Sequence, residues 1–69
     1  MIEVFKTDVE NKVVAQELSI ELSSRLSASS VSFDLEDCDK VLRIESSCMD
    51  PWVVIHTLKR RGFNCEVLE

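Results

Sequence analysis

Residues 31–45 read VSFDLEDCDKVLRIE, two short runs of alternating apolar and polar residues joined by the polar segment EDCD. Alternation with a period of two is typical of a strand that buries one face. The positions expected to face the core share an apolar side chain; they are Val31, Phe33, Leu35, Leu42 and Ile44. The stretch therefore predicts a β-hairpin with a tight polar turn.

A short strand is predicted upstream, over residues 2–6, where the alternation is weaker. Ile2 and Val4 are expected on one face of this strand, and Glu3 and Phe5 on the other. With this phase, Phe5 points to the face of the sheet that no helix covers.

A helix is predicted from about residue 8 to residue 27. Thr7 and Glu10 match a capping box, in which a hydroxyl and a carboxylate satisfy free backbone N–H groups at a helix start. One stripe of the helix is apolar, at Val14, Leu18, Leu22 and Leu26, with Ala15 beside it. The segment KTDVENK, residues 6–12, is therefore interpreted as a helix start.

A second helix is predicted to begin at Asp50-Pro51, because aspartate is a good N-cap and proline is tolerated at the first helical position. Gly62 marks its end, after the basic cluster Lys59-Arg60-Arg61, whose charges suit the negative end of a helix dipole. A last strand follows, in which Phe63, Cys65 and Val67 face the core.

The predicted order is β-α-β-β-α-β within a single domain, residues 1–69. Right-handed connections leave one good arrangement for this order. It is an α+β, ferredoxin-like sandwich: a four-stranded antiparallel sheet in the order 4-1-3-2, with two helices on one face. The other face of the sheet is expected to be open.

Composition narrows the function classes. The net charge of −5 opposes binding of a phosphate backbone, so no nucleic-acid partner is expected. No apolar run approaches the roughly 18 residues of a membrane span, and no secretory signal is visible, so no membrane insertion is expected. Three cysteines, an odd number without close pairing, favour a reducing compartment. We therefore expect a cytoplasmic protein.

The segments FDLEDCDKVLRIES and VVIHTLKRRGFNCEVLE together resemble the second half of heavy-metal-associated domains, which occur in copper chaperones and metal-transporting ATPases. The shared features are the hairpin, the pair Val54 and Leu58 ahead of Gly62, and the step from Gly62 to Phe63 with the small Cys65 inside. The resemblance implies the ferredoxin-like fold. It also implies a CxxC pair at the first helix, and KTDVENK contains no cysteine there.

Candidate metal ligands are sparse. Cys38, with Asp37, Asp39 and Glu10 expected nearby, offers a weak mixed site, whereas soft cations prefer two converging thiolates. Cys48 is expected at the opposite end of the molecule. No metal site, cofactor or catalytic residue is predicted, since the single histidine, His56, has no nucleophile or carboxylate expected beside it.

Apolar residues that the core does not need are candidates for partner binding. They are Phe5, Val41 and Leu68 on the open sheet face, and Trp52 off the core face of the second helix. Val13 and Ile20 are expected to be exposed as well.

The favoured hypothesis is a non-enzymatic interaction or regulatory module that binds another protein or itself, including as a homodimer, through the sheet face or a sheet edge. The alternative is an atypical copper or zinc carrier that uses Cys38 or Cys48, including across a dimer. A small-molecule sensor is a third option, for which no residue argues.

Overall fold

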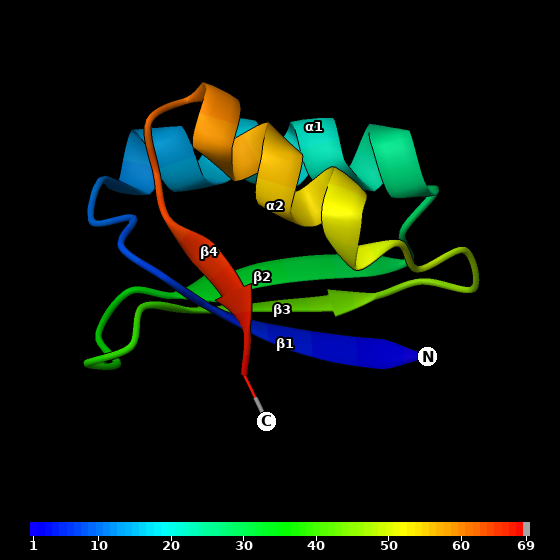
Figure 1. The fold of residues 1–69 in the computed structure, drawn as a ribbon, viewed down its shortest axis with the longest axis horizontal. Helices are drawn as coiled ribbons and strands as arrows, with labels where there is room; N and C mark the ends of the chain where they lie inside the picture. Colours follow the sequence, from blue (N-terminus) through cyan, green and yellow to red (C-terminus); the bar gives the residue numbers. More distant parts are fainter. Residues whose placement is uncertain (69) are drawn as a thin grey trace.

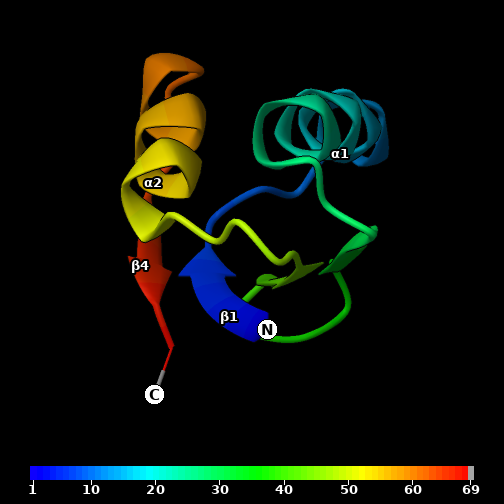
Figure 2. The same cartoon turned by 90° about the vertical axis from the view of Figure 1, so that its right-hand side faces the viewer.

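The computed structural model describes residues 1–68 as one α+β unit. Its elements, in chain order, are β1 (Ile2–Thr7), α1 (Lys12–Leu26), β2 (Ser30–Asp34), β3 (Val41–Glu45), α2 (Pro51–Arg60) and β4 (Cys65–Val67). The strands form one antiparallel sheet in the order β2-β3-β1-β4, which is the predicted order read from the other edge. Both helices lie on the same face of the sheet (Figures 1 and 2). In the described residues, no helix is long and apolar enough to cross a membrane.

The core lies between the two helices and the sheet. Its buried apolar side chains come from all layers of the fold: Phe5, Val9, Ala15, Leu18, Leu22, Leu26, Leu42, Ile44, Val54 and Leu58. The predicted stripe of α1, with Val14 half-buried at its margin, and the predicted inward positions Leu42 and Ile44 of β3 are therefore confirmed. Half-buried side chains of β2, including Val31 and Phe33, pack against the same core.

The predicted orientation of Phe5 is wrong, because this side chain is fully buried. Phe5 lies opposite Leu42 in the antiparallel pair of β1 and β3, and residues directly opposite each other share a face. Val4 lies opposite the exposed Arg43 and so takes the open face instead. Burying a phenylalanine removes more apolar area from water than burying a valine. The phase of β1 is therefore the one that places Phe5 beside Leu42 in the core.

The predicted start of α1 is also wrong. Thr7 is the last residue of β1, and its buried hydroxyl donates to the Lys40 carbonyl at 2.6 Å and accepts from the Val9 N–H at 3.3 Å. The N-cap is Asn11, whose side chain accepts from the N–H groups of Val13 and Val14 at 2.8 and 3.2 Å. A local amide cap therefore replaces the capping box.

The predicted ends of α2 are confirmed. Asp50 caps its start by accepting from the Trp52 N–H at 3.1 Å, and Pro51 occupies the first position. At the other end Gly62 has a φ of 89°, which L-residues rarely adopt. The N–H groups of Gly62 and Phe63 then donate to the carbonyls of Lys59 and Leu58, which closes the helix with a Schellman motif.

Candidate functional site

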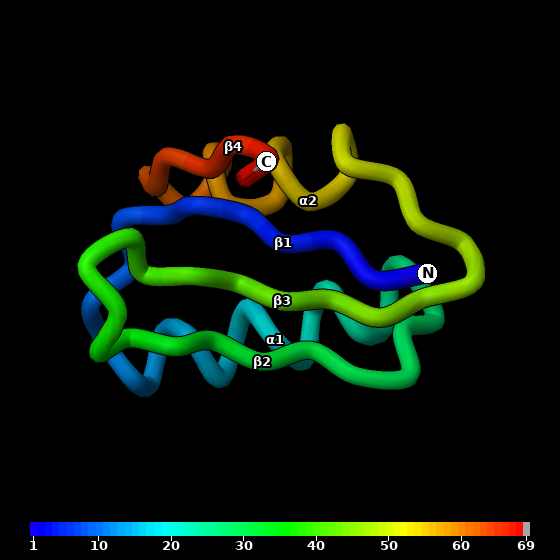
Figure 3. Tube along the Cα trace, turned by 90° about the horizontal axis from the view of Figure 1, so that it is seen from below, coloured from blue at the N-terminus to red at the C-terminus, as the bar shows by residue number. Residues whose placement is uncertain are grey.

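The outer edge of β2 is an unpaired edge of the sheet (Figure 3). Natural edge strands are usually protected by lysine, proline, a bulge or short length. The sequence of β2, SVSFD, has five residues with neither lysine nor proline, and its only charge is at its last residue. The other edge strand, β4, has only three residues. The β2 edge is therefore the more open of the two.

The pairing register shows which backbone groups of β2 face outward. The Ser46 N–H donates to the Met1 carbonyl, so even-numbered residues of β3 bond to β1 and odd-numbered ones bond to β2. Arg43 then exchanges bonds with Ser32, its partner in β2. By the same alternation, the N–H and C=O groups of Val31 and Phe33 point away from the sheet.

A groove runs beside this edge, between β2 and α1. It consists of two adjoining hollows, with volumes of about 450 and 470 Å³, that share the lining residues Gln16, Ser19 and Val31. Figure 3 shows α1 lying behind β2 and β3 when the molecule is viewed from the open face. The apolar part of the lining is Ala15, Ile20, Val31, Phe33 and Leu35. We call this depression and the outward backbone of Val31 and Phe33 the β2 edge site.

Carboxylates lie at only one end of the β2 edge site. Asp34 and Glu36 are there, whereas the other end is lined by serines, including Ser24 and Ser30. The residues that α1 contributes include no acid.

The acids of α1 lie on its other side, toward α2. Glu17 accepts from Arg61 at 2.8 Å, and Glu21 from Arg60 at 3.3 Å and from Arg25 at 2.9 Å. The chain is acidic, yet α1 contributes no carboxylate to the β2 edge site; its one charged residue there is Lys12, in the half of the groove that also carries Asp34 and Glu36. Two arginines of the basic cluster, Arg60 and Arg61, therefore join α2 to α1 by ion pairs. The cluster also lies at the end of α2, as predicted.

The open face of the sheet carries a smaller apolar area than predicted. Val4, Val41 and Leu68 line a shallow hollow of about 270 Å³ together with Phe33, Arg43 and other polar or charged residues of β2 and the β2–β3 turn. The N–H of Leu68 donates to the Val4 carbonyl, so the two residues are neighbours. Without Phe5, the one aromatic residue that lines this hollow is Phe33, which packs against the core on the helix side of the sheet.

Trp52 is exposed on α2, as predicted, with 69% of its surface accessible. Its ring meets the exposed His56 edge-on, with ring centroids 5.7 Å apart. Arg25 and Arg60 line the shallow depression beside these rings. Both arginines are already paired with Glu21, so this surface offers little free charge.

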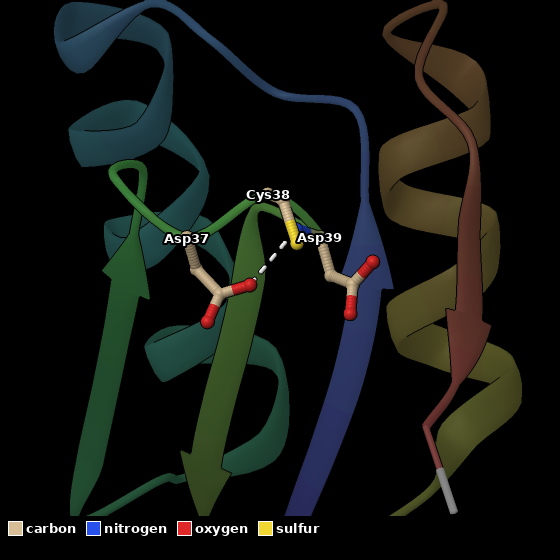
Figure 4. A group of neighbouring side chains, drawn as sticks. All are labelled: Asp37, Cys38 and Asp39. Atoms are coloured by element: carbon tan, nitrogen blue, oxygen red, sulfur yellow. Dashed lines mark hydrogen bonds between the residues drawn. The ribbon is translucent and has the colours of Figure 1, made fainter.

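One group of possible metal ligands converges in the described part of the chain. The ligand atoms of Asp37, Cys38 and Asp39, in the turn between β2 and β3, lie within 4.8 Å of one another (Figure 4). The Asp37 carboxylate accepts the Asp39 N–H at 2.8 Å, and Asp39 pairs with Lys6 at 3.7 Å. One soft and two hard donors do not fit a soft cation.

The other two cysteines do not join this turn. Cys48 lies in the segment between β3 and α2, at the opposite end of the molecule from the β2–β3 turn (Figure 1). Cys65 in β4 is half-buried, and burial, with the negative charges of Glu66 and Asp8, raises its pKa to about 12. Its thiol therefore stays protonated and is a poor ligand at neutral pH.

No protein-family model matches the chain, and no curated protein is significantly similar to it. Function must therefore be inferred from the surfaces described above.

Sequence reasoning missed the β2 edge site as a specific surface. The signal available was the absence of lysine and proline from SVSF, in a chain where charged residues are common. The predicted strand order already placed this strand at a sheet edge, but it did not show a groove between the strand and α1.

Proposed function

We propose that this chain is a non-enzymatic protein-interaction module that binds an extended segment of a protein partner at the β2 edge site. The observation that carries the proposal is the coincidence of outward backbone groups on Val31 and Phe33 with an apolar groove beside them. Main-chain hydrogen bonds supply affinity in this mode of recognition, and alternate side chains that enter a groove supply specificity.

The same proposal includes the finer classification as a ferredoxin-like domain similar to heavy-metal-associated domains but without their thiol pair. It is supported by the element order and the strand order. A cytoplasmic location also belongs to the proposal, supported by the odd number of cysteines.

The proposal favours the β2 edge site over the open sheet face. The apolar residues of that face, Val4, Val41 and Leu68, are small or aliphatic and are flanked by charged side chains. Binding hot spots are usually aromatic residues or arginines in well-packed pockets. The hollow on the open face is shallow, and although Arg43 lies there, its one aromatic residue, Phe33, packs against the core.

A library of random peptides displayed on phage, panned against the reduced protein, tests the proposal. We expect selected peptides to shift the backbone amide signals of Val31 and Phe33 in nitrogen-15 NMR spectra. Val31→Pro should abolish their binding because it removes an outward donor, while Val31→Ala, which keeps the N–H, should retain most of it. Val41→Ser should have no effect.

Two results would contradict the proposal. One is a set of peptides whose signals map to Val41 and Leu68 or to Trp52 instead. The other is equal affinity of the selected peptides for Val31→Pro and for the wild-type chain.

A further inference from the structure

We propose that the partner at the β2 edge site is a second copy of this chain, joined strand to strand around a two-fold axis at Ser32. This inference rests on the proposed function, because it names the occupant of the same site. Three properties of the site favour it: the outward backbone pattern of β2, the distribution of charges along β2, and a flank from α1 that carries Lys12 but no acid.

The backbone pattern of β2 is self-complementary. With Ser32 on the axis of an antiparallel pair, Val31 of each copy lies opposite Phe33 of the other. These are the two residues whose N–H and C=O groups point outward, so in this register all four outward residues of the two strands form hydrogen-bonded pairs. The paired valine and phenylalanine side chains then meet twice on the helix side, where such pairs stabilise a sheet.

Charge selects the antiparallel arrangement. A parallel pair in register would place the two Asp34 carboxylates directly opposite each other, about 5 Å apart. In the antiparallel pair, Asp34 lies opposite Ser30 of the second copy. The two aspartates are then about 13 Å apart, which exceeds the Debye length of about 8 Å at physiological salt. The hydroxyl-lined end of each groove meets the acidic end of the other.

The flank contributed by α1 allows this approach. Its groove-lining residues include no acid, because Glu17 and Glu21 are turned toward α2. Ile20, on the outer side of the groove, is 65% exposed, and Val13, nearer the start of α1, is equally exposed. Two copies of an acidic protein can therefore meet along this side without opposing carboxylates on their helices, and the exposed aliphatic side chains lose contact with water.

Sedimentation equilibrium on the reduced wild-type chain, from about 10 μM to about 1 mM, measures the association, since edge contacts of this size are expected to be weak. Reductant prevents crosslinking through the exposed Cys38 and Cys48. We expect a monomer–dimer equilibrium. Val31→Pro should weaken it about tenfold or more, because each copy loses a hydrogen bond, whereas Val31→Ala should weaken it less.

Substitutions at Ser30 test the register. Ser30→Lys faces Asp34 of the second copy in the proposed pair and should tighten the dimer at least about twofold at low salt, while Ser30→Asp should weaken it. Ser30→Asn is the uncharged control. Unfolding by urea, measured in parallel, separates these effects from changes in the stability of the monomer, where Ser30 also lies opposite Glu45.

Slowed amide hydrogen exchange at Val31 and Phe33 with rising protein concentration supports the inference without any variant. A wild-type chain that stays monomeric up to about 1 mM overturns it, as does a dimer unaffected by Val31→Pro and by both charged variants at Ser30. In either case the proposed function stands if displayed peptides still bind at β2. It falls if they do not.

Discussion

At the scale of the residue, Cys65 is the side chain with the most perturbed chemistry. Burial in β4 comes first among the causes, and the nearby charges of Glu66 and Asp8 act in the same direction, raising the pKa from its ordinary value of 9.0 to about 12. A thiol with a raised pKa is unreactive, because the thiolate is the nucleophile. Cys38 and Cys48 are both exposed. The chain thus carries two accessible thiols and one protected thiol.

The pKa of Cys65 predicts a pH dependence of stability. Below pH 9 the thiol is protonated in both the folded and the unfolded state, so it contributes its full share there. Between pH 9 and about 12 the unfolded state loses the proton and the folded state keeps it, so stability falls. We expect urea unfolding of the wild-type chain to weaken more over this window than unfolding of Cys65→Ser.

Comparing the two proteins cancels the titration of lysines, which occurs in the same window. Parallel slopes for wild type and Cys65→Ser would show that the thiol is solvated in the folded state.

At the scale of the element, the start of α1 depends on one amide side chain. Asn11 accepts from two N–H groups, and Glu10 is exposed and outside the helix. We expect Asn11→Ala to lower the free energy of unfolding by about 1 kcal/mol. Glu10→Ala should change it by less than about 0.5 kcal/mol. Urea denaturation followed by circular dichroism measures both.

A larger loss in Glu10→Ala than in Asn11→Ala would restore the capping box and contradict the observed cap. Asn11→Ala and Glu10→Ala are a matched pair, because the two residues are neighbours at the start of α1 and only Asn11 caps the helix.

Elements with local signals could be predicted from the sequence, and elements fixed by distant partners could not. The ends of α2 follow from Asp50, Pro51 and Gly62, which act within a few residues of themselves. The phase of β1 cannot be predicted from nearby residues, because Val4 and Phe5 are both apolar. Only the pairing of Phe5 with Leu42, far along the chain, decides which of the two is buried.

At the scale of the whole molecule, the candidate site was harder to predict than the fold. The predicted strand order already placed β2 at a sheet edge, but a groove beside it also requires that α1 lie next to β2, and that is not a property of any one segment. The Phe5 candidate failed for the same reason, whereas the exposed position of Trp52 followed from the phase of its own helix.

Two thiols lie at the end that carries the β2–β3 turn, because Cys65 pairs with Thr7, which bonds to Asp39 of the turn. Cys38 is exposed, whereas Cys65 is half-buried with a pKa raised to about 12, so we expect no tight binding of Cu(I) by the monomer. In a competition titration against a chromogenic Cu(I) chelator, the reduced wild-type chain and Cys38→Ser should behave alike, because a single thiolate beside carboxylates is a poor soft-metal site. The protein should also be folded without added metal.

Tight one-to-one binding that disappears in Cys38→Ser would instead favour a metal carrier. Binding of one Cu(I) per two chains that requires Cys48 would favour the version of that alternative in which the metal bridges a dimer.

The hydrogen bond from the Leu68 N–H to the Val4 carbonyl places Leu68, the last residue that the structure describes, beside β1, the strand that begins at Ile2. This part of the sheet holds β1 and β4, and β3 separates it from β2. A fluorescent label, an affinity tag or a neighbouring domain joined at either terminus would therefore leave the β2 edge accessible.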